Sequence, residues 1–293
     1  MKNYLEVGQT PLIPIEIDGV LIWGKAEFMN PSGSIKDRPI KNILTRAVEN
    51  GLLSKGGTVV EATSGNAGIS FAMYCAEIGF KCVIVMPSNM SEERKKMLRL
   101  YGAELIEVGP GDFDSAIKMR DELSEKNGWF NGNQFASPWN IEAHRDGTGV
   151  ELLHQVKYNN FKPSAFVLGT GTGGTLMGAG ETLKNYCHDM AIVAVEPSES
   201  PVMSGGQPGL HGIQGIGDGS KFMVDLEFVN HIITVSTEEA KQMAIRLAKE
   251  KGIFVGISAG ANVLASLKYG KKFGKTNILT ILCDRGDRYL SIL

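Results

Sequence analysis

Two short stretches carry residues whose types and spacing suit the chemistry of a bound cofactor. The first, NPSGSIKDRP, sets Lys36 directly after a Ser/Gly-rich turn. Pro39 fits only the first turn of a helix, so we expect a helix to begin near Lys36 or Asp37. A protonated lysine at a helix N-terminus opposes the helix dipole, and this cost is absent if its nitrogen is bound as an imine. For a lysine taken by itself, a solvated surface cation is the simpler interpretation.

The second stretch is the glycine-rich loop GTGTGGT at residues 169–175, which follows an apolar run and precedes a helical pattern. Backbone N–H groups of such a loop face an anion at the helix N-terminus, so we expect it to bind a phosphate. Gly169, Gly171 and Gly174 also satisfy the G-x-G-x-x-G pattern of dinucleotide folds, and Glu196 ends the next strand where a ribose ligand is expected. An NAD-dependent dehydrogenase is therefore an alternative that this loop leaves open.

The elements that must position these residues alternate along the chain. Short β-rich runs such as TVVEA, CVIVM and AIVAVE are each followed by a longer helical pattern, which indicates α/β architecture. Strands without clear polar alternation indicate parallel sheets covered by helices on both faces. Ligands of open α/β sheets bind beyond the carboxyl ends of the strands, so the loops EATSGNAG, LGTGTGGT and VGISAGA are the expected sites of chemistry.

Composition narrows the class of partner. The chain has 293 residues and a formal net charge of -2, without the basic footprint of a nucleic-acid or anionic-membrane binder. No apolar run approaches the roughly 20 residues that span a bilayer. The four cysteines are far apart and no His pairs with them in a zinc pattern, so we expect reduced thiols, no metal site and a cytoplasmic protein.

Six motifs occur in the order found in one family: NPSGSIKDR, TSGNAGI, GTGTGGT, GIQGIG, GISAGA and DRGDRYLS. The chain resembles the cysteine synthase and cystathionine β-synthase family, pyridoxal-phosphate-dependent enzymes of the tryptophan-synthase-β-like fold. The resemblance implies fold type II, with two domains that are each a mostly parallel twisted sheet flanked by helices. It implies a larger cofactor-holding domain at 1–36 and 143–293, a smaller mobile domain at 37–142, and a homodimer.

The same resemblance implies roles for individual residues. Lys36 matches the lysine that forms an imine with pyridoxal 5'-phosphate and later removes the substrate Cα proton. Asn66 matches the partner of the cofactor's ring hydroxyl, and Ser258 the partner of its pyridine nitrogen, although a helix N-cap is a second interpretation of Ser258. The residues that match the phosphate-binding loop are Gly171, Thr172, Gly173, Gly174 and Thr175. Those that match the substrate-carboxylate site are Thr63, Ser64, Asn66 and Gln134.

The activity implied is replacement of the β substituent of an activated L-serine, such as O-acetylserine, by sulfide through an aminoacrylate, giving L-cysteine. Two positions depart from the family pattern. Ala67 lacks the hydroxyl that relatives often place in the carboxylate loop, which puts substrate affinity in question. Asp218 stands where relatives often have an apolar residue, so its carboxylate could activate water, or it could simply shape a Gly-flanked turn.

Four alternatives remain at this point. Within the fold, hydration through Asp218 predicts an L-cysteine desulfidase that releases hydrogen sulfide and forms L-serine, and serine or threonine dehydratases use the same lysine. A dehydrogenase predicts no imine chromophore. A binding or regulatory protein predicts lost catalysis, against which the intact Lys36, Asn66, Gly171 and Ser258 argue.

Overall fold

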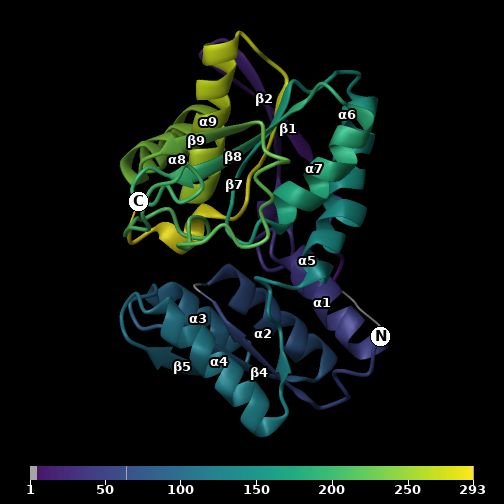
Figure 1. The fold of residues 1–293 in the computed structure, drawn as a ribbon, viewed down its shortest axis with the longest axis vertical. Helices are drawn as coiled ribbons and strands as arrows, with labels where there is room; N and C mark the ends of the chain where they lie inside the picture. Colours follow the sequence, from purple (N-terminus) through teal and green to yellow (C-terminus); the bar gives the residue numbers. More distant parts are fainter. Residues whose placement is uncertain (1–4, 64, 293) are drawn as a thin grey trace. The chain divides into compact units, whose positions relative to one another are not determined.

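The computed structural model describes residues 5–63 and 65–292, and within them the contacts divide the chain into two compact units. The larger unit comprises Gly8–Ile35 and the described residues from Ile141 onward. The smaller unit comprises Lys36–Asn140 with the described residues up to Val7. Each unit has its own sheet and its own hydrophobic clusters, and Figure 1 shows their elements.

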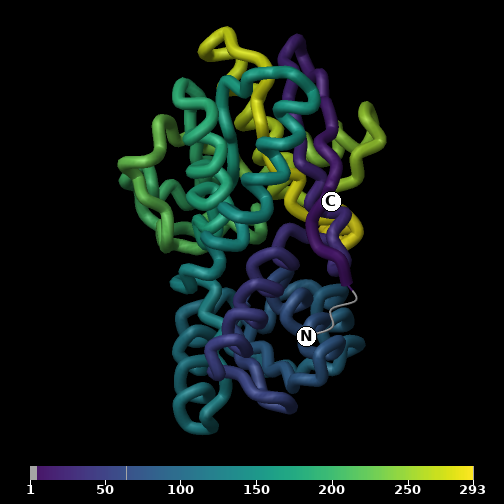
Figure 2. The backbone as a smooth tube through the Cα atoms, turned by 90° about the vertical axis from the view of Figure 1, so that its right-hand side faces the viewer, coloured from purple at the N-terminus to yellow at the C-terminus, as the bar shows by residue number. Residues whose placement is uncertain are grey.

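The larger unit is built on a six-stranded sheet in the order β1-β2-β10-β7-β8-β9. All neighbours pair in parallel except β1 and β2, which form an antiparallel hairpin. The N-terminal hairpin, purple in Figure 2, lies beside the yellow C-terminal strand β10. The strand bounds are β1 Leu12–Ile17, β2 Val20–Lys25, β7 Ala165–Gly169, β8 Ala191–Pro197, β9 His231–Val235 and β10 Ile278–Ile281.

Helices cover both faces of this sheet, as the apolar runs of its central strands require. One cluster of buried residues joins α8 and α9 to the sheet, and a second joins α6 and α7 to its other face. The helix bounds are α6 Val150–Tyr158, α7 Gly174–Tyr186, α8 Thr237–Lys251 and α9 Ile257–Phe273, with a π-helical segment at His144–Gly149 and 3-10 turns at Glu27–Met29 and Gly286–Tyr289.

Strand β1 is an element that the sequence analysis does not predict. The segment LIPIEI contains Pro14, which weakens a strand prediction, but β1 is an edge strand, where proline is tolerated. Asp18 and Gly19 both have positive φ, 47° and 78°, which suits the tight turn of a two-residue hairpin. The Asp-Gly pair was the signal that could have predicted the hairpin.

The smaller unit has a four-stranded parallel sheet in the order β5-β4-β3-β6. Helices α1, α2 and α3 pack on one face of it and α4 packs on the other. The bounds are β3 Thr58–Ala62, β4 Lys81–Pro87, β5 Glu104–Val108, β6 Phe130–Asn131, α1 Asp37–Glu49, α2 Asn66–Ile78, α3 Glu92–Leu100 and α4 Phe113–Asn127; α5, Pro138–Ala143, follows. The α/β class with parallel, helix-covered sheets is confirmed. Across the described residues, every helix is too short or too polar to cross a bilayer.

Candidate active site

Lys36 stands at the start of α1, as the position of Pro39 predicted. It is the N-cap residue of this helix and is half-buried. The residues before it are fixed within the larger unit, because the Ile35 N–H donates to the Cys283 carbonyl at 2.9 Å and Ser34 pairs with Asp284 in an isolated bridge. The backbone that leads into Lys36 is therefore anchored, which suits a lysine that must present its nitrogen in one place.

The glycine loop connects the end of β7 to the start of α7, so its amides lie at the N-terminus of a 13-residue helix. A Cβ at Gly171 would lie 2.5 Å from the Gly215 carbonyl oxygen, and one at Gly173 would lie 2.8 Å from a Val224 methyl. Gly173 also has φ of 87°, a conformation that favours glycine. These positions form a cradle that side chains would fill, which fits the phosphate of pyridoxal phosphate.

His144 is a site residue that the sequence analysis does not single out. It is 2% exposed, and its ring bonds the Thr148 hydroxyl at 2.9 Å and the Thr175 hydroxyl at 3.1 Å. Thr175 is the last residue of the phosphate-loop motif. The π-helical segment that carries His144 therefore braces this loop, and no sequence spacing signals the contact because 31 residues separate the pair.

We expect Gly171→Ala to weaken cofactor binding by at least about tenfold, because the added methyl group displaces the loop amides from the phosphate. Titration of the apoprotein with pyridoxal phosphate, followed by absorbance, measures the affinity. Gly109→Ala is a matched control, because Gly109, like Gly171, has no positive φ, and a Cβ at Gly109 would meet other atoms only at 3.6 Å or more. Equal affinity in the parent and the Gly171→Ala variant would contradict this use of the loop.

Asp218 lies near the same loop in the larger unit. It is half-buried, and its Oδ2 is 3.7 Å from the position of a Cβ at Gly171. Ser258 is 4% exposed and is the second residue of α9, whose N-cap is Gly256. The N-cap interpretation of Ser258 is therefore wrong, because the N-cap lies two residues earlier than that interpretation requires.

In the smaller unit the carboxylate-loop residues follow β3 and open α2. Thr63 is buried and its hydroxyl accepts from the Gly65 N–H at 3.1 Å, while Asn66 is half-buried at the first position of α2. Ser64 lies outside the described residues. Ala67 belongs to the hydrophobic cluster of this unit, so its methyl group packs in the core.

Gln134 comes from the loop after β6 and is 3% exposed. Its N–H donates to Glu61 Oε2 at 3.1 Å, and its carbonyl accepts from the Asn140 side chain at 2.9 Å. Glu61 is fully buried at the end of β3, and burial raises the pKa of its carboxyl while Arg120 opposes that rise. The structure thus joins Gln134 to the strand that leads into the carboxylate loop.

Glu196, whose position in the sequence suggested a ribose-binding residue of a dinucleotide site, bonds the protein backbone instead. Its carboxylate is buried and accepts from the Met203 N–H at 2.7 Å and the Ser204 N–H at 3.0 Å. These bonds hold the turn that follows β8. Because both oxygens of the Glu196 carboxylate accept hydrogen bonds from this turn, Glu196 is not expected to bind a ribose.

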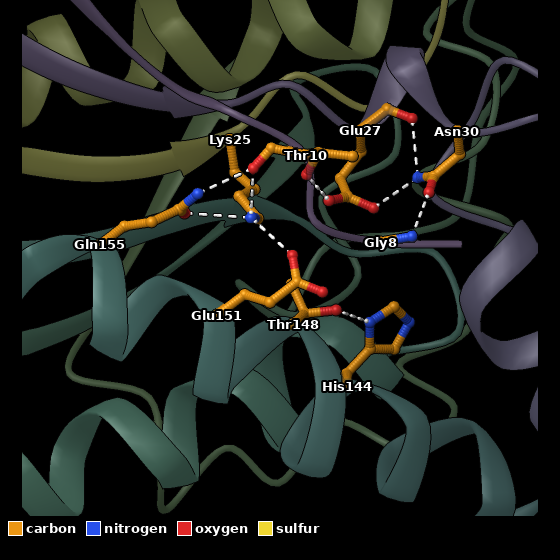
Figure 3. A network of polar contacts seen from close by, with 9 residues as sticks. All are labelled: Gly8, Thr10, Lys25, Glu27, Asn30, His144, Thr148, Glu151 and Gln155. Atoms are coloured by element: carbon orange, nitrogen blue, oxygen red, sulfur yellow. Dashed lines mark hydrogen bonds and ion pairs between the residues drawn. The ribbon is translucent and has the colours of Figure 1, made fainter. Parts of the chain in front are cut away.

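A second polar network, drawn in Figure 3, ties the end of β2 to α6. Lys25 is fully buried, and its Nζ contacts the Thr10 carbonyl at 2.6 Å, Glu151 Oε2 at 2.7 Å and Gln155 Oε1 at 3.0 Å. Helix α6 follows directly on the segment that carries His144. The network therefore holds β2 against α6, the helix that follows the His144 segment. All three contacts use the Lys25 amine, so this amine has a structural role.

The helix-covered parallel sheets and the glycine cradle define a phosphate-cofactor enzyme of the α/β class. A family model described as "Pyridoxal-phosphate dependent enzyme" matches residues 4–284. The chain therefore belongs to the pyridoxal-phosphate-dependent enzyme family, and pyridoxal phosphate is its cofactor. The resemblance to the cysteine synthase family is confirmed, as is fold type II.

Similar proteins include cysteine synthases and a hydrogen sulfide-producing enzyme. A cysteine synthase of Staphylococcus aureus (strain Mu50 / ATCC 700699) is 42% identical over 97% of this chain and 94% of its own length. The crystal structure of an Entamoeba histolytica cysteine synthase has a TM-score of 0.90 at 36% identity, covering 98% of this chain and 88% of that one. A hydrogen sulfide-producing enzyme of Fusobacterium nucleatum has a TM-score of 0.93 at 38% identity, with the same coverage of 98% and 88%.

Proposed function

We propose that this enzyme replaces the β substituent of an activated L-serine, such as O-acetylserine, with sulfide and so forms L-cysteine. The observation that carries the proposal is the glycine cradle at the start of α7, in a chain that presents Lys36 at an anchored helix start. The cysteine synthase relatives support the choice of substrates. Bound pyridoxal phosphate supplies an electron sink that labilises the substrate Cα proton and the β leaving group.

We propose the following roles for this chain's own residues. Lys36 holds the cofactor and accepts the Cα proton. Gly171, Thr172, Gly173, Gly174 and Thr175 bind the phosphate. Asn66 and Ser258 bond the cofactor ring. Because Ser258 is a neutral hydroxyl, it stabilises a protonated pyridine less than a carboxylate would, which favours prompt loss of the β leaving group over transamination. Thr63, Ser64, Asn66 and Gln134 bind the substrate carboxylate.

Motion and assembly are proposed on the family resemblance. The segment 37–142 moves as a unit and excludes water when substrate binds. The protein is a homodimer in the cytoplasm that acts on a small amino acid and sulfide. Sedimentation of the purified protein tests the homodimer.

The direction of sulfide flux tests the activity. The holoenzyme is given O-acetylserine with sulfide in one vessel and L-cysteine alone in another, and sulfide, cysteine and serine are measured in both. Sulfide uptake with formation of cysteine supports the proposal. Preferential release of sulfide from cysteine would contradict it and would favour the second candidate.

That second candidate is an L-cysteine desulfidase that forms hydrogen sulfide and L-serine. It is favoured by the Asp218 carboxylate beside Gly171 and by the hydrogen sulfide-producing relative. In this reaction the Cβ–S bond breaks and hydrogen sulfide leaves. Asp218 would then take a proton from water as the water oxygen bonds to the substrate Cβ and a proton returns to Cα.

For the desulfidase, we expect Asp218→Asn to lower serine formation from L-cysteine about 100-fold, because an amide cannot accept the proton. Sulfide uptake with O-acetylserine should stay near the parent rate. Ser220→Ala, in the same loop and exposed, is the matched control. Serine formation at the parent rate in the Asp218→Asn variant would remove the desulfidase hypothesis.

A further inference from the structure

A buried ion pair in the smaller unit lies next to the proposed substrate-carboxylate site. Glu61 is 0% exposed and Arg120 is 4% exposed, and Arg120 Nη1 lies 3.2 Å from Glu61 Oε1. Arg120 comes from the middle of α4, and Glu61 is the penultimate residue of β3. The pair therefore links a helix on one face of the sheet to the strand end that opens into the carboxylate loop.

Glu61 is surrounded by donors. Its Oε1 accepts from the Ala62 N–H at 2.8 Å as well as from Arg120, and its Oε2 accepts from the Gln134 N–H. A carboxylate offers only acceptors and matches this set, whereas a protonated carboxyl would add a hydrogen that these donors cannot accept.

The loop that carries Gln134 is shaped around this carboxylate. A Cβ at Gly132 would lie 2.7 Å from Glu61 Oε2 and 2.5 Å from the ring of Phe71, so the backbone approaches where only glycine fits. Asn133 then has φ of 40°, and its N–H donates to the Asn131 side chain at 3.0 Å. The backbone therefore reaches Gln134 through a constrained turn, and the first residue after this turn, Gln134, bonds Glu61.

Arg120 is itself held from the other side. Its Nε donates to Asp121 Oδ1 at 2.9 Å, and the same oxygen accepts from the Asn131 side chain at 2.8 Å. The chain of contacts thus runs from Asn131 through Asp121 and Arg120 to Glu61 and returns to the loop at Gln134. One end of the turn before Gln134 is therefore attached to Asp121 of α4 and the other end to Glu61 of β3, and Arg120 bonds both carboxylates.

We propose that the Glu61–Arg120 pair positions Gln134 for the substrate carboxylate. Glu61 holds the main-chain N–H of Gln134, and Arg120 keeps Glu61 ionised and aimed at it. Glu61 and Arg120 are positioning residues that act through Gln134. The inference rests on the proposed function, since it takes the Gln134 side chain as a ligand of the substrate.

The test is a double-mutant cycle on Glu61→Gln and Gln134→Ala, with KM and kcat measured for O-acetylserine and sulfide. Glu61→Gln should raise KM for O-acetylserine about tenfold with kcat within about twofold, the pattern of lost ground-state binding. Gln134→Ala should do the same, and the double variant should be no worse than the more impaired single variant. The KM of Arg120→Lys, which keeps the charge, should be closer to the parent KM than that of Arg120→Met.

Amide hydrogen exchange gives a readout that does not depend on activity. Exchange of the Gln134 amide should speed up in Glu61→Gln, because an acceptor of that N–H is weakened. Lys95→Met is the matched control, because Lys95 is buried and pairs with Glu107 at 2.7 Å in the same unit. It should change neither KM nor exchange at Gln134.

Different failures are distinguishable. A raised KM in Gln134→Ala with an unchanged KM in Glu61→Gln overturns the positioning role and leaves the role of Gln134 intact. Additive effects in the double variant, or unchanged exchange at Gln134, also overturn it. An unchanged KM in Gln134→Ala overturns the proposed role of Gln134 in substrate binding, and the positioning role falls with it.

Discussion

Replacement of Lys36 by alanine is expected to lower the rate of cysteine formation by at least about 10³-fold, because the variant lacks both the cofactor's covalent attachment and the base for the Cα proton. The visible absorption of the holoenzyme should disappear or shift to that of free cofactor. Steady-state assays of sulfide uptake and an absorption spectrum of the dialysed variant measure the two effects.

Lys25 provides a second check of the same assignment. Its amine is buried and already bonded to Thr10, Glu151 and Gln155. Reduction of the holoenzyme with borohydride, followed by peptide mass mapping, should therefore find the cofactor on Lys36 and none on Lys25. Lys41→Ala, five residues after Lys36 in α1, is the control and should keep the visible absorption and the rate of the parent. Cofactor found on another lysine would contradict the assignment.

The second large effect is on stability. Arg120→Met should lower the free energy of unfolding by about 3–5 kcal/mol at pH 8, because it leaves the buried Glu61 charge without its cation. Chemical denaturation with a spectroscopic probe measures the change. The double variant Glu61→Gln with Arg120→Met removes both charges and should recover most of the loss.

This loss should depend on pH. Burial raises the pKa of Glu61 in the folded protein above its ordinary value of 4.5. The contribution of protonated Glu61 to the free energy of unfolding is therefore fully present below about pH 4.5, and it is lost as the pH rises through the raised folded pKa. Arg120 lowers that pKa, and removing Arg120 raises it further. The difference in unfolding free energy between the parent and Arg120→Met should therefore be larger at pH 8 than at pH 5. A difference independent of pH would contradict the ionised pair.

The sequence determined the parts of this protein that depend on local chemistry. The start of α1 at Asp37 follows from Pro39, whose ring fits only the first turn, and the phosphate loop follows from glycines placed between an apolar strand and a helix. The α/β class follows from the alternation of strand and helix patterns. The family, and with it the cofactor, follows from several motifs in a fixed order.

Only the tertiary structure decided which distant residues support those motifs. His144 and Thr175 are 31 positions apart, and Glu61 and Gln134 are 73 apart, so no local periodicity relates the members of either pair. Buried charges such as Glu61 and Arg120 look like ordinary surface residues in a sequence, because burial is a property of packing. Glu196 shows the converse, since its spacing fits a ribose ligand while the fold gives its carboxylate to a backbone turn. The conformational preferences of neighbouring residues determine where helices and strands begin. The packing of segments that are distant in the sequence determines which groups their side chains bond.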